Sequence, residues 1–300
     1  MKPSDWRGTF AAITTPFTDG GSVDHGFLRD HIAWLLENGV GGIVALGSLG
    51  EAPTLTADEK RSILRVAQAA VADRVPLIAG ISAMSTTEAQ ALARDAAEIG
   101  CDGLMVLPPY VYRGDWRETA EHVQTVLDAT PLSCMLHNDP IAYGTDLTPA
   151  QIRELSRHRN LHAVKESSGD LRRVTAIREF LDDRLAIFVG MDDVVVESVA
   201  AGAVGWIAGL VNALPQESVR LFDRARCDGP DAARSLYEWF LPLLRLDTVP
   251  KFVQLIKLVQ QEVGMGRATV RPPRLELVGK ELESATALIR DHLARRPGTA

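Results

Sequence analysis

Residues 75–109, VPLIAGISAMSTTEAQALARDAAEIGCDGLMVLPP, contain the pattern that repeats along this chain. A short apolar run at 75–82 is followed by a helical stretch at 86–100 and then by a second apolar run at 103–109. The helical stretch opens with Thr86 and ends at Gly100, residues typical of a helix N-cap and of the position after a helix. The apolar runs do not alternate with polar residues, which is typical of parallel strands buried on both faces.

Apolar runs of this kind occur eight times, with a helical stretch after each. The runs are 9–17, 41–48, 75–82, 103–109, 132–140, 161–168, 185–193 and 204–212. The helical stretches are 24–38, 56–72, 86–100, 115–129, 148–158, 171–181, 194–201 and 215–226. Eight strand–helix units predict an α/β fold of the (β/α)8 type, the TIM barrel. A doubly wound sheet is the weaker alternative, because no GxGxxG motif follows the first run.

The pattern changes after residue 226. Residues 231–246, 249–264 and 275–295 are amphipathic and predict three further helices. We therefore expect a barrel at 1–226 and, at 227–300, a C-terminal helical extension of the same domain.

Composition limits the classes of function. The chain has 300 residues, of which 46% are hydrophobic and 24% are charged, so a disordered or collagen-like chain is excluded. The net charge is −7, and without a basic cluster nucleic acid is not an expected partner. No apolar run has the roughly 18 residues that a membrane span needs, and the N-terminus lacks the pattern of a signal peptide. We expect a cytoplasmic protein that does not bind membranes.

Lys165 is the most informative candidate for catalysis. Active sites of such barrels form at the C-terminal ends of the strands, and Lys165 alone among the six lysines lies inside a predicted strand. Burial lowers the pKa of an amine and makes it a nucleophile toward carbonyl or imine carbon. The alternative is a structural ion pair with Glu166 or with Asp192 or Asp193.

Three other strand ends carry candidate groups. The turn Gly47–Glu51 offers backbone N–H groups and the Ser48 hydroxyl, which suit an anion such as a carboxylate; the alternative is a tight turn. His137 ends the fifth run, where it either transfers protons or fills the core. Tyr110 follows the fourth run and either relays protons or packs. No metal is expected, because no cluster of His, Cys and carboxylate ligands is present.

Several motifs occur in the order and spacing of one known family. They are GTFAAITTPF at 8–17, GSLGE at 47–51, PPY at 108–110, HNDP at 137–140, VKESSGD at 164–170 and GMDD at 190–193. With these motifs, nearly the whole chain resembles the dihydrodipicolinate synthase/N-acetylneuraminate lyase family of class I aldolase-like barrels. The resemblance implies an enzyme that forms a Schiff base with a small 2-oxo acid or cyclic imine acid. It implies no cofactor and a homotetramer, a dimer of dimers.

The resemblance also implies roles for individual residues. Lys165 matches the Schiff-base lysine, and Tyr110 matches a tyrosine that reaches into a neighbouring subunit's site. Ser48 and Leu49 match the pair that binds the substrate carboxylate. Ile207 matches the position whose carbonyl borders the pocket.

The chain departs from the family pattern at two places. His137 stands where the family has a tyrosine that relays protons, so Tyr143 and Tyr110 are candidates to compensate. Residues 141–144 lack the arginine with which the synthases hold a second carboxylate. The second departure argues against a role in lysine biosynthesis.

Longer stretches narrow the resemblance further. Residues 165–175, 208–215, 239–248 and 271–277 are similar to the Δ1-pyrroline-4-hydroxy-2-carboxylate deaminases of bacterial hydroxyproline breakdown. This predicts a lyase or hydrolase that releases 2-oxoglutarate semialdehyde and ammonia. The alternatives are a dihydrodipicolinate synthase-like aldolase, a 2-keto-3-deoxy sugar acid dehydratase and a non-catalytic 2-oxo acid binding protein.

Overall fold

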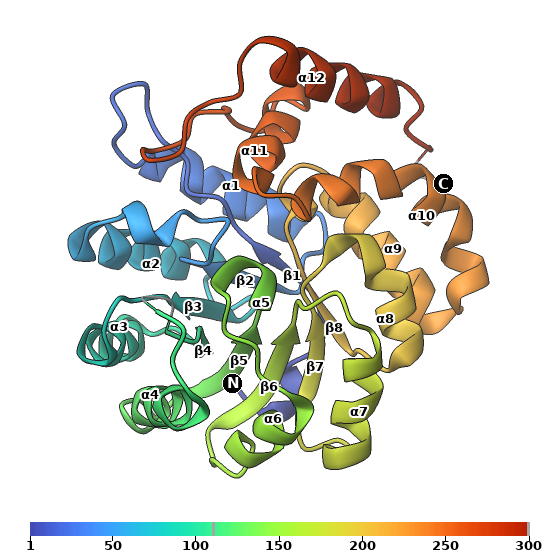
Figure 1. Cartoon of the computed structure of the whole chain (residues 1–300). Coiled ribbons are helices and arrows are strands. Elements are labelled where there is room, and N and C mark those ends of the chain that lie inside the picture. The colour runs from blue at the N-terminus through green and yellow to red at the C-terminus, as the bar shows by residue number, and fades with distance from the viewer. Residues whose placement is uncertain (110–111, 299–300) are drawn as a thin grey trace.

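The computed structural model describes residues 1–109 and 112–298 and shows a closed barrel of eight parallel strands in sequence order (Figure 1). The strands are β1 (Gly8–Ala12), β2 (Gly42–Ala45), β3 (Leu77–Ile81), β4 (Gly103–Val106), β5 (Ser133–Asn138), β6 (Leu161–Glu166), β7 (Ala186–Val189) and β8 (Gly205–Ala208). Each begins within one residue of a predicted apolar run or inside it, and helices follow them around the barrel. The (β/α)8 prediction is confirmed.

The helices of the barrel follow the predicted stretches closely. They are α1 (His25–Glu37), α2 (Ala57–Val71), α3 (Thr86–Ile99), α4 (Trp116–Asp128), α6 (Pro149–Leu155), α7 (Arg172–Leu181), α8 (Val195–Ala201) and α9 (Pro215–Cys227). A further short helix, α5 (Pro140–Tyr143), follows β5 and was not expected from the sequence pattern. It begins where the Asp139 side chain accepts a hydrogen bond from the Ala142 N–H.

The N-cap of α3 differs from the prediction. Thr86 is the first helical residue, and the cap is Ser85, whose hydroxyl accepts a hydrogen bond from the Glu88 N–H. Ser85 has extended backbone dihedrals, as an N-cap requires. The Thr86 hydroxyl instead lies 2.9 Å from Nδ1 of His122 on the neighbouring helix α4.

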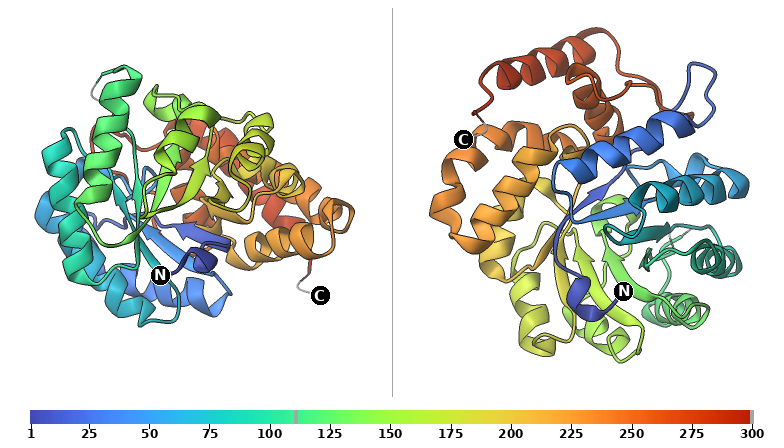
Figure 2. Two further views of the ribbon diagram at one scale, coloured as in Figure 1. Left: turned by 90° about the horizontal axis from the view of Figure 1, so that it is seen from below. Right: turned by 180° about the vertical axis from the view of Figure 1, so that it is seen from behind.

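The N-terminal end of the barrel is closed by aromatic side chains. Trp6 packs against Phe10 and Phe188 inside the barrel, with ring centroids 6.2 and 6.1 Å away. Its indole N–H donates a hydrogen bond to the Ser133 hydroxyl at 2.7 Å, at the start of β5. Figure 2 (right) shows the N-terminal segment lying across this end. The open end of the barrel is therefore the one formed by the C-terminal ends of the strands.

Three helices follow the barrel, as predicted: α10 (Pro230–Leu244), α11 (Phe252–Glu262) and α12 (Gly279–Ala294). Figure 1 shows α11 between α12 and the barrel. Gln260 of α11 accepts a hydrogen bond from the Thr14 hydroxyl, which lies just after β1. The extension thus packs on the open end, while the division of the chain at residue 226 stays a prediction.

Within residues 1–109 and 112–298, no helix has the length and apolar character that crossing a membrane requires.

Candidate active site

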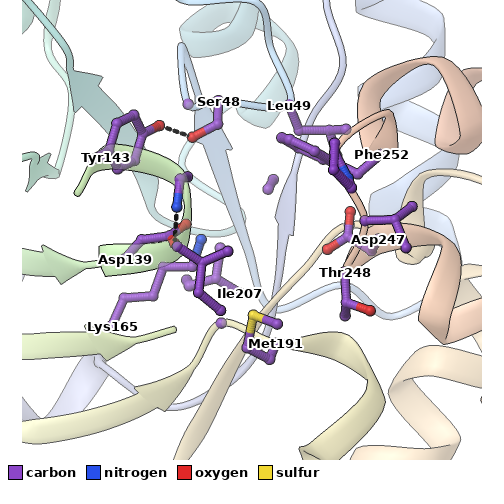
Figure 3. A pocket seen from close by; sticks show the side chains of 18 of the residues that line it. Ser48, Leu49, Asp139, Tyr143, Lys165, Met191, Ile207, Asp247, Thr248 and Phe252 are labelled. Carbon is purple, nitrogen blue, oxygen red and sulfur yellow. Dashed lines mark hydrogen bonds between the residues drawn. The ribbon is translucent and has the colours of Figure 1, made fainter. Parts of the chain in front are cut away.

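A cavity of about 420 Å³ opens at the C-terminal ends of the strands. Its wall comes from the C-terminal parts of all strands except β3, from the segment that joins α10 to α11, and from Arg274 after α11. Lys165, Ser48, Leu49 and Ile207 all line it (Figure 3). Residues that are far apart in the sequence therefore meet in one place: Lys165, Ser48 and Leu49 were expected from strand ends, and Ile207 from the family resemblance.

Lys165 extends from the end of β6 into this cavity. In the barrel register it lies beside His137 of β5 and Phe188 of β7. The ion pairs that lysines form within the described part of the chain involve Lys60, Lys251 and Lys257, and none involves Lys165. The carboxylate of Glu166, one suggested partner, instead accepts hydrogen bonds from the Asn138 amide and the Ser168 N–H.

Burial lowers the pKa of Lys165, while the charges of Asp139, Asp247 and Asp192 oppose that effect. A lowered pKa increases the share of neutral amine at physiological pH. A neutral amine at the cavity wall can attack the carbonyl or imine carbon of a bound molecule.

Two glycines make room for the side chains at the cavity wall. A Cβ atom on Gly190 would lie 2.5 Å from Cε of Lys165 and 1.9 Å from the Ser167 hydroxyl. A Cβ atom on Gly209 would lie 2.2 Å from Oδ1 of Asp247. Only glycine leaves enough space for Lys165 and Asp247 in these positions.

The turn after β2 lies across the cavity from β6. Ser48 is partly exposed there, and its hydroxyl is hydrogen-bonded to the phenol of Tyr143 from α5. The turn is held at its far end by Glu51, a buried residue with the left-handed φ of 54°. The Glu51 carboxylate forms an ion pair of 2.6 Å with Lys257 of α11. The C-terminal extension therefore anchors the turn that carries Ser48.

His137 is buried and is not part of the cavity wall. Its Nε2 lies 3.5 Å from the Ser167 hydroxyl and 3.8 Å from Oδ2 of Asp139. Its Nδ1 has no hydrogen-bond partner among the described residues. Burial and the charge of Lys165 hold the pKa of His137 well below its usual value, which favours the neutral imidazole.

Tyr143 lies nearer to the cavity than His137 does. Its ring contacts His137 edge-on, with centroids 5.9 Å apart, and it forms part of the cavity wall. Tyr110, the other predicted tyrosine, lies outside the described residues, so its position in the site stays a prediction.

Several residues of the wall were not assigned a role from the sequence, among them Asp139, Met191, Asp247 and Arg274. Asp139 directly follows β5, Met191 comes two residues after β7, and both belong to quoted motifs, so the strand-end rule offered a signal for them. Asp247 and Arg274 come from the C-terminal extension, which the rule for barrels does not cover. Only the three-dimensional packing reveals that they reach the site.

The comparisons with known proteins agree with this architecture. Residues 5–292 match the model of the dihydrodipicolinate synthetase family. A 4-hydroxy-tetrahydrodipicolinate synthase from Citrifermentans bemidjiense is 30% identical over 287 residues, which is 96% of this chain and 99% of that protein.

Solved structures give the same result. The 4-hydroxy-tetrahydrodipicolinate synthase of Methylacidiphilum fumariolicum SolV has a TM-score of 0.90 at 28% identity, covering 96% of this chain and 97% of that one. The dihydrodipicolinate synthase of Acinetobacter baumannii, solved with pyruvate, has a TM-score of 0.91 at 27% identity. The match covers 95% of this chain and 98% of that one. This chain is therefore an enzyme of the lyase type and belongs to the dihydrodipicolinate synthetase family.

Proposed function

We propose that Lys165 forms a Schiff base with C2 of a small 2-oxo acid or cyclic imine acid. The observation that carries this proposal is an amine at the cavity wall with a lowered pKa and no ion pair in the described part of the chain. The Ser48 hydroxyl and the Leu49 N–H are proposed to hold the substrate carboxylate, which orients C2 toward the amine, and the Ile207 carbonyl is proposed to border the pocket.

The substrate that we propose is Δ1-pyrroline-4-hydroxy-2-carboxylate. Lys165 attacks C2, and the ring opens to release its nitrogen as an amine on C5. The protonated Schiff base acidifies the C3 proton, and loss of that proton leads to loss of the C4 hydroxyl. Tautomerisation and hydrolysis then yield 2-oxoglutarate semialdehyde and ammonia, with a net uptake of one water. The missing arginine at 141–144 and the four stretches similar to the deaminases support this choice.

Proton transfer from C3 is assigned to His137. Histidine is the commonest proton acceptor in enzymes, and a single water can carry the proton to a base that does not touch the substrate. Tyr143 is the alternative, because its phenol lines the cavity and bonds to Ser48.

The test measures ammonia release from Δ1-pyrroline-4-hydroxy-2-carboxylate by the purified protein, the Lys165→Ala variant and a control, Lys251→Ala, whose side chain is 49% exposed. Wild type and control should turn over at about one per second or faster, and Lys165→Ala should not. Borohydride in the presence of pyruvate should trap a covalent adduct on wild type and on the control but not on Lys165→Ala. Absence of ammonia from folded wild type would refute the deaminase assignment, and absence of trapping would refute the Schiff base.

A second candidate is a synthase-like aldolase acting on a substrate with two carboxylates. The observation that favours it is Arg274, which lines the cavity and has no ion pair within the described residues. Consumption or release of pyruvate without ammonia would select this candidate. A product of dehydration alone would select a 2-keto-3-deoxy sugar acid dehydratase.

The proposed assembly is a homotetramer. Met84 and Tyr112 are 58% and 60% exposed on loops after β3 and β4, which fits an apolar contact between subunits. Light scattering coupled to size-exclusion chromatography should give about four times the chain mass of 32.6 kDa. A monomer would refute the proposal.

A further inference from the structure

The carboxyl groups around Lys165 differ in how their oxygens are bonded. Asp139, Asp192 and Asp247 all act on the charge of Lys165. Asp192 accepts hydrogen bonds from the Trp206 indole at 2.8 Å and from the backbone N–H groups of Gly209 and Leu210. Its role is therefore to hold the chain after β8.

Asp139 is also bonded, because it caps α5 through the Ala142 N–H at 3.0 Å. Asp247 is different: its Oδ1 is shielded from solvent and has no hydrogen-bond partner among the described residues. An unpartnered buried polar group costs about 1–3 kcal/mol of stability. Such a cost at a cavity wall is typical of a group that meets its partner only when a ligand binds.

The surrounding fold makes room for this carboxyl group at the cavity. Gly209 is the residue that faces it, and a side chain there would collide with Oδ1. Figure 3 shows the Asp247 carboxyl group pointing into the cavity from the side opposite Lys165 and Tyr143. A molecule with its first carbon at Ser48 and its second on Lys165 has its remaining carbons free to extend toward Asp247.

The charges that face Asp247 favour its protonated form. Burial and the charge of Asp192 raise the pKa of Asp247 well above its ordinary value, with Asp139 and Asp193 adding to this and Lys165 opposing it. A carboxyl group that keeps its proton near neutral pH is a hydrogen-bond donor and an acid.

We propose that Asp247 is the catalytic acid that protonates the departing C4 hydroxyl of the substrate bound to Lys165. The proposal rests on the proposed function. The electron pair of the C3–H bond forms the enamine and then the C3=C4 double bond. The C4–O bond breaks, and the hydroxyl takes the proton of Asp247 and leaves as water. Asp247 regains a proton from solvent, and no external oxidant or reductant is needed.

The test compares wild type with Asp247→Asn, which keeps the shape of the side chain and removes the acid. Asp231→Asn is the matched control, because Asp231 is an exposed carboxylate on α10 with a side chain 88% accessible. Ammonia release from Δ1-pyrroline-4-hydroxy-2-carboxylate should fall at least 100-fold in Asp247→Asn, the lower end of general acid catalysis. Borohydride trapping with pyruvate and exchange of the pyruvate methyl protons into deuterium oxide should stay within about threefold of wild type.

The pH profile supplies a second measurement. Wild-type kcat should fall as the pH rises through the pKa of Asp247, and the residual activity of Asp247→Asn should lack this limb. Ammonia release within threefold of wild type in Asp247→Asn would overturn the proposal, and so would an equal loss of trapping and ammonia release. If wild type itself releases no ammonia, the proposed function fails and this proposal with it, a result distinct from an active Asp247→Asn.

Discussion

Lys165 and Lys257 both lie inside the fold, but their surroundings give the two amines different chemistry. Lys257 is 1% exposed, and its ammonium group lies 2.6 Å from the Glu51 carboxylate and 2.8 Å from the Thr269 carbonyl. Lys165 has no such partners within the described residues, and a cavity lies in front of it. Burial lowers the pKa of each, but only Lys165 is placed where a neutral amine can meet a substrate.

The roles of His137 and Tyr143 can be separated by substitution. We expect His137→Phe to lower kcat at least 100-fold because the proton acceptor is lost. We expect Tyr143→Phe to raise KM more than it lowers kcat, since the phenol is hydrogen-bonded to the carboxylate-binding Ser48. Steady-state ammonia release by the two variants is the measurement. The opposite pattern would assign proton transfer to Tyr143.

At the scale of elements, local signals set the strands and most helix ends. The capping box of α2, with Thr56 and Glu59, forms as its spacing indicates. The short helix α5 lay below the length at which periodicity is visible, yet it brings Tyr143 to the cavity. Contacts between elements, such as that of α11 with the turn after β2, left no local signal.

The contact between α11 and the turn after β2 predicts a large loss of stability on substitution. Lys257→Met leaves the buried Glu51 carboxylate without its cation, and we expect a loss of about 3–5 kcal/mol. Lys251→Met is the matched control, because Lys251 and Glu281 form an exposed pair, and we expect a loss below about 1 kcal/mol. Urea unfolding measures both variants. Equal losses would show that the buried pair does not stabilise the fold.

At the scale of the whole molecule, a buried hydrogen bond joins the first and last units of the barrel. His31 of α1 is 1% exposed, and its Nε2–H donates a hydrogen bond to the Asn212 carbonyl, 2.9 Å away in the 3-10 turn Leu210–Asn212. This bond connects the first helix of the barrel to the loop after its last strand. The bond forms only when the barrel closes.

The burial of His31 predicts that the stability of the fold decreases at acid pH. Burial lowers the pKa of His31 from 6.5 to about 4. Between pH 6.5 and pH 4 the unfolded chain binds more protons than the folded one. The contribution of neutral His31 to the free energy of unfolding is therefore complete above pH 6.5 and is lost as the pH falls toward 4. The difference between the pKa values of His31 in the unfolded and folded chain corresponds to about 3 kcal/mol of stability.

The variant His31→Gln should lose less stability than wild type between pH 7 and pH 4, because glutamine does not titrate. Urea unfolding at several pH values in this range is the measurement. An equal loss in the two proteins would mean that His31 does not contribute to acid unfolding.

The sequence by itself determined the barrel, because eight apolar runs separated by amphipathic stretches leave few other ways to bury the strands. It also determined that Lys165, Ser48 and Leu49 meet, since parallel strands place their C-terminal ends at one edge of the barrel. Which groups surround Lys165 depended on the tertiary structure. Asp247 and Arg274 reach the cavity from the C-terminal extension, and His137 is withdrawn behind its wall. These positions depend on packing between residues distant in sequence, which no local pattern encodes.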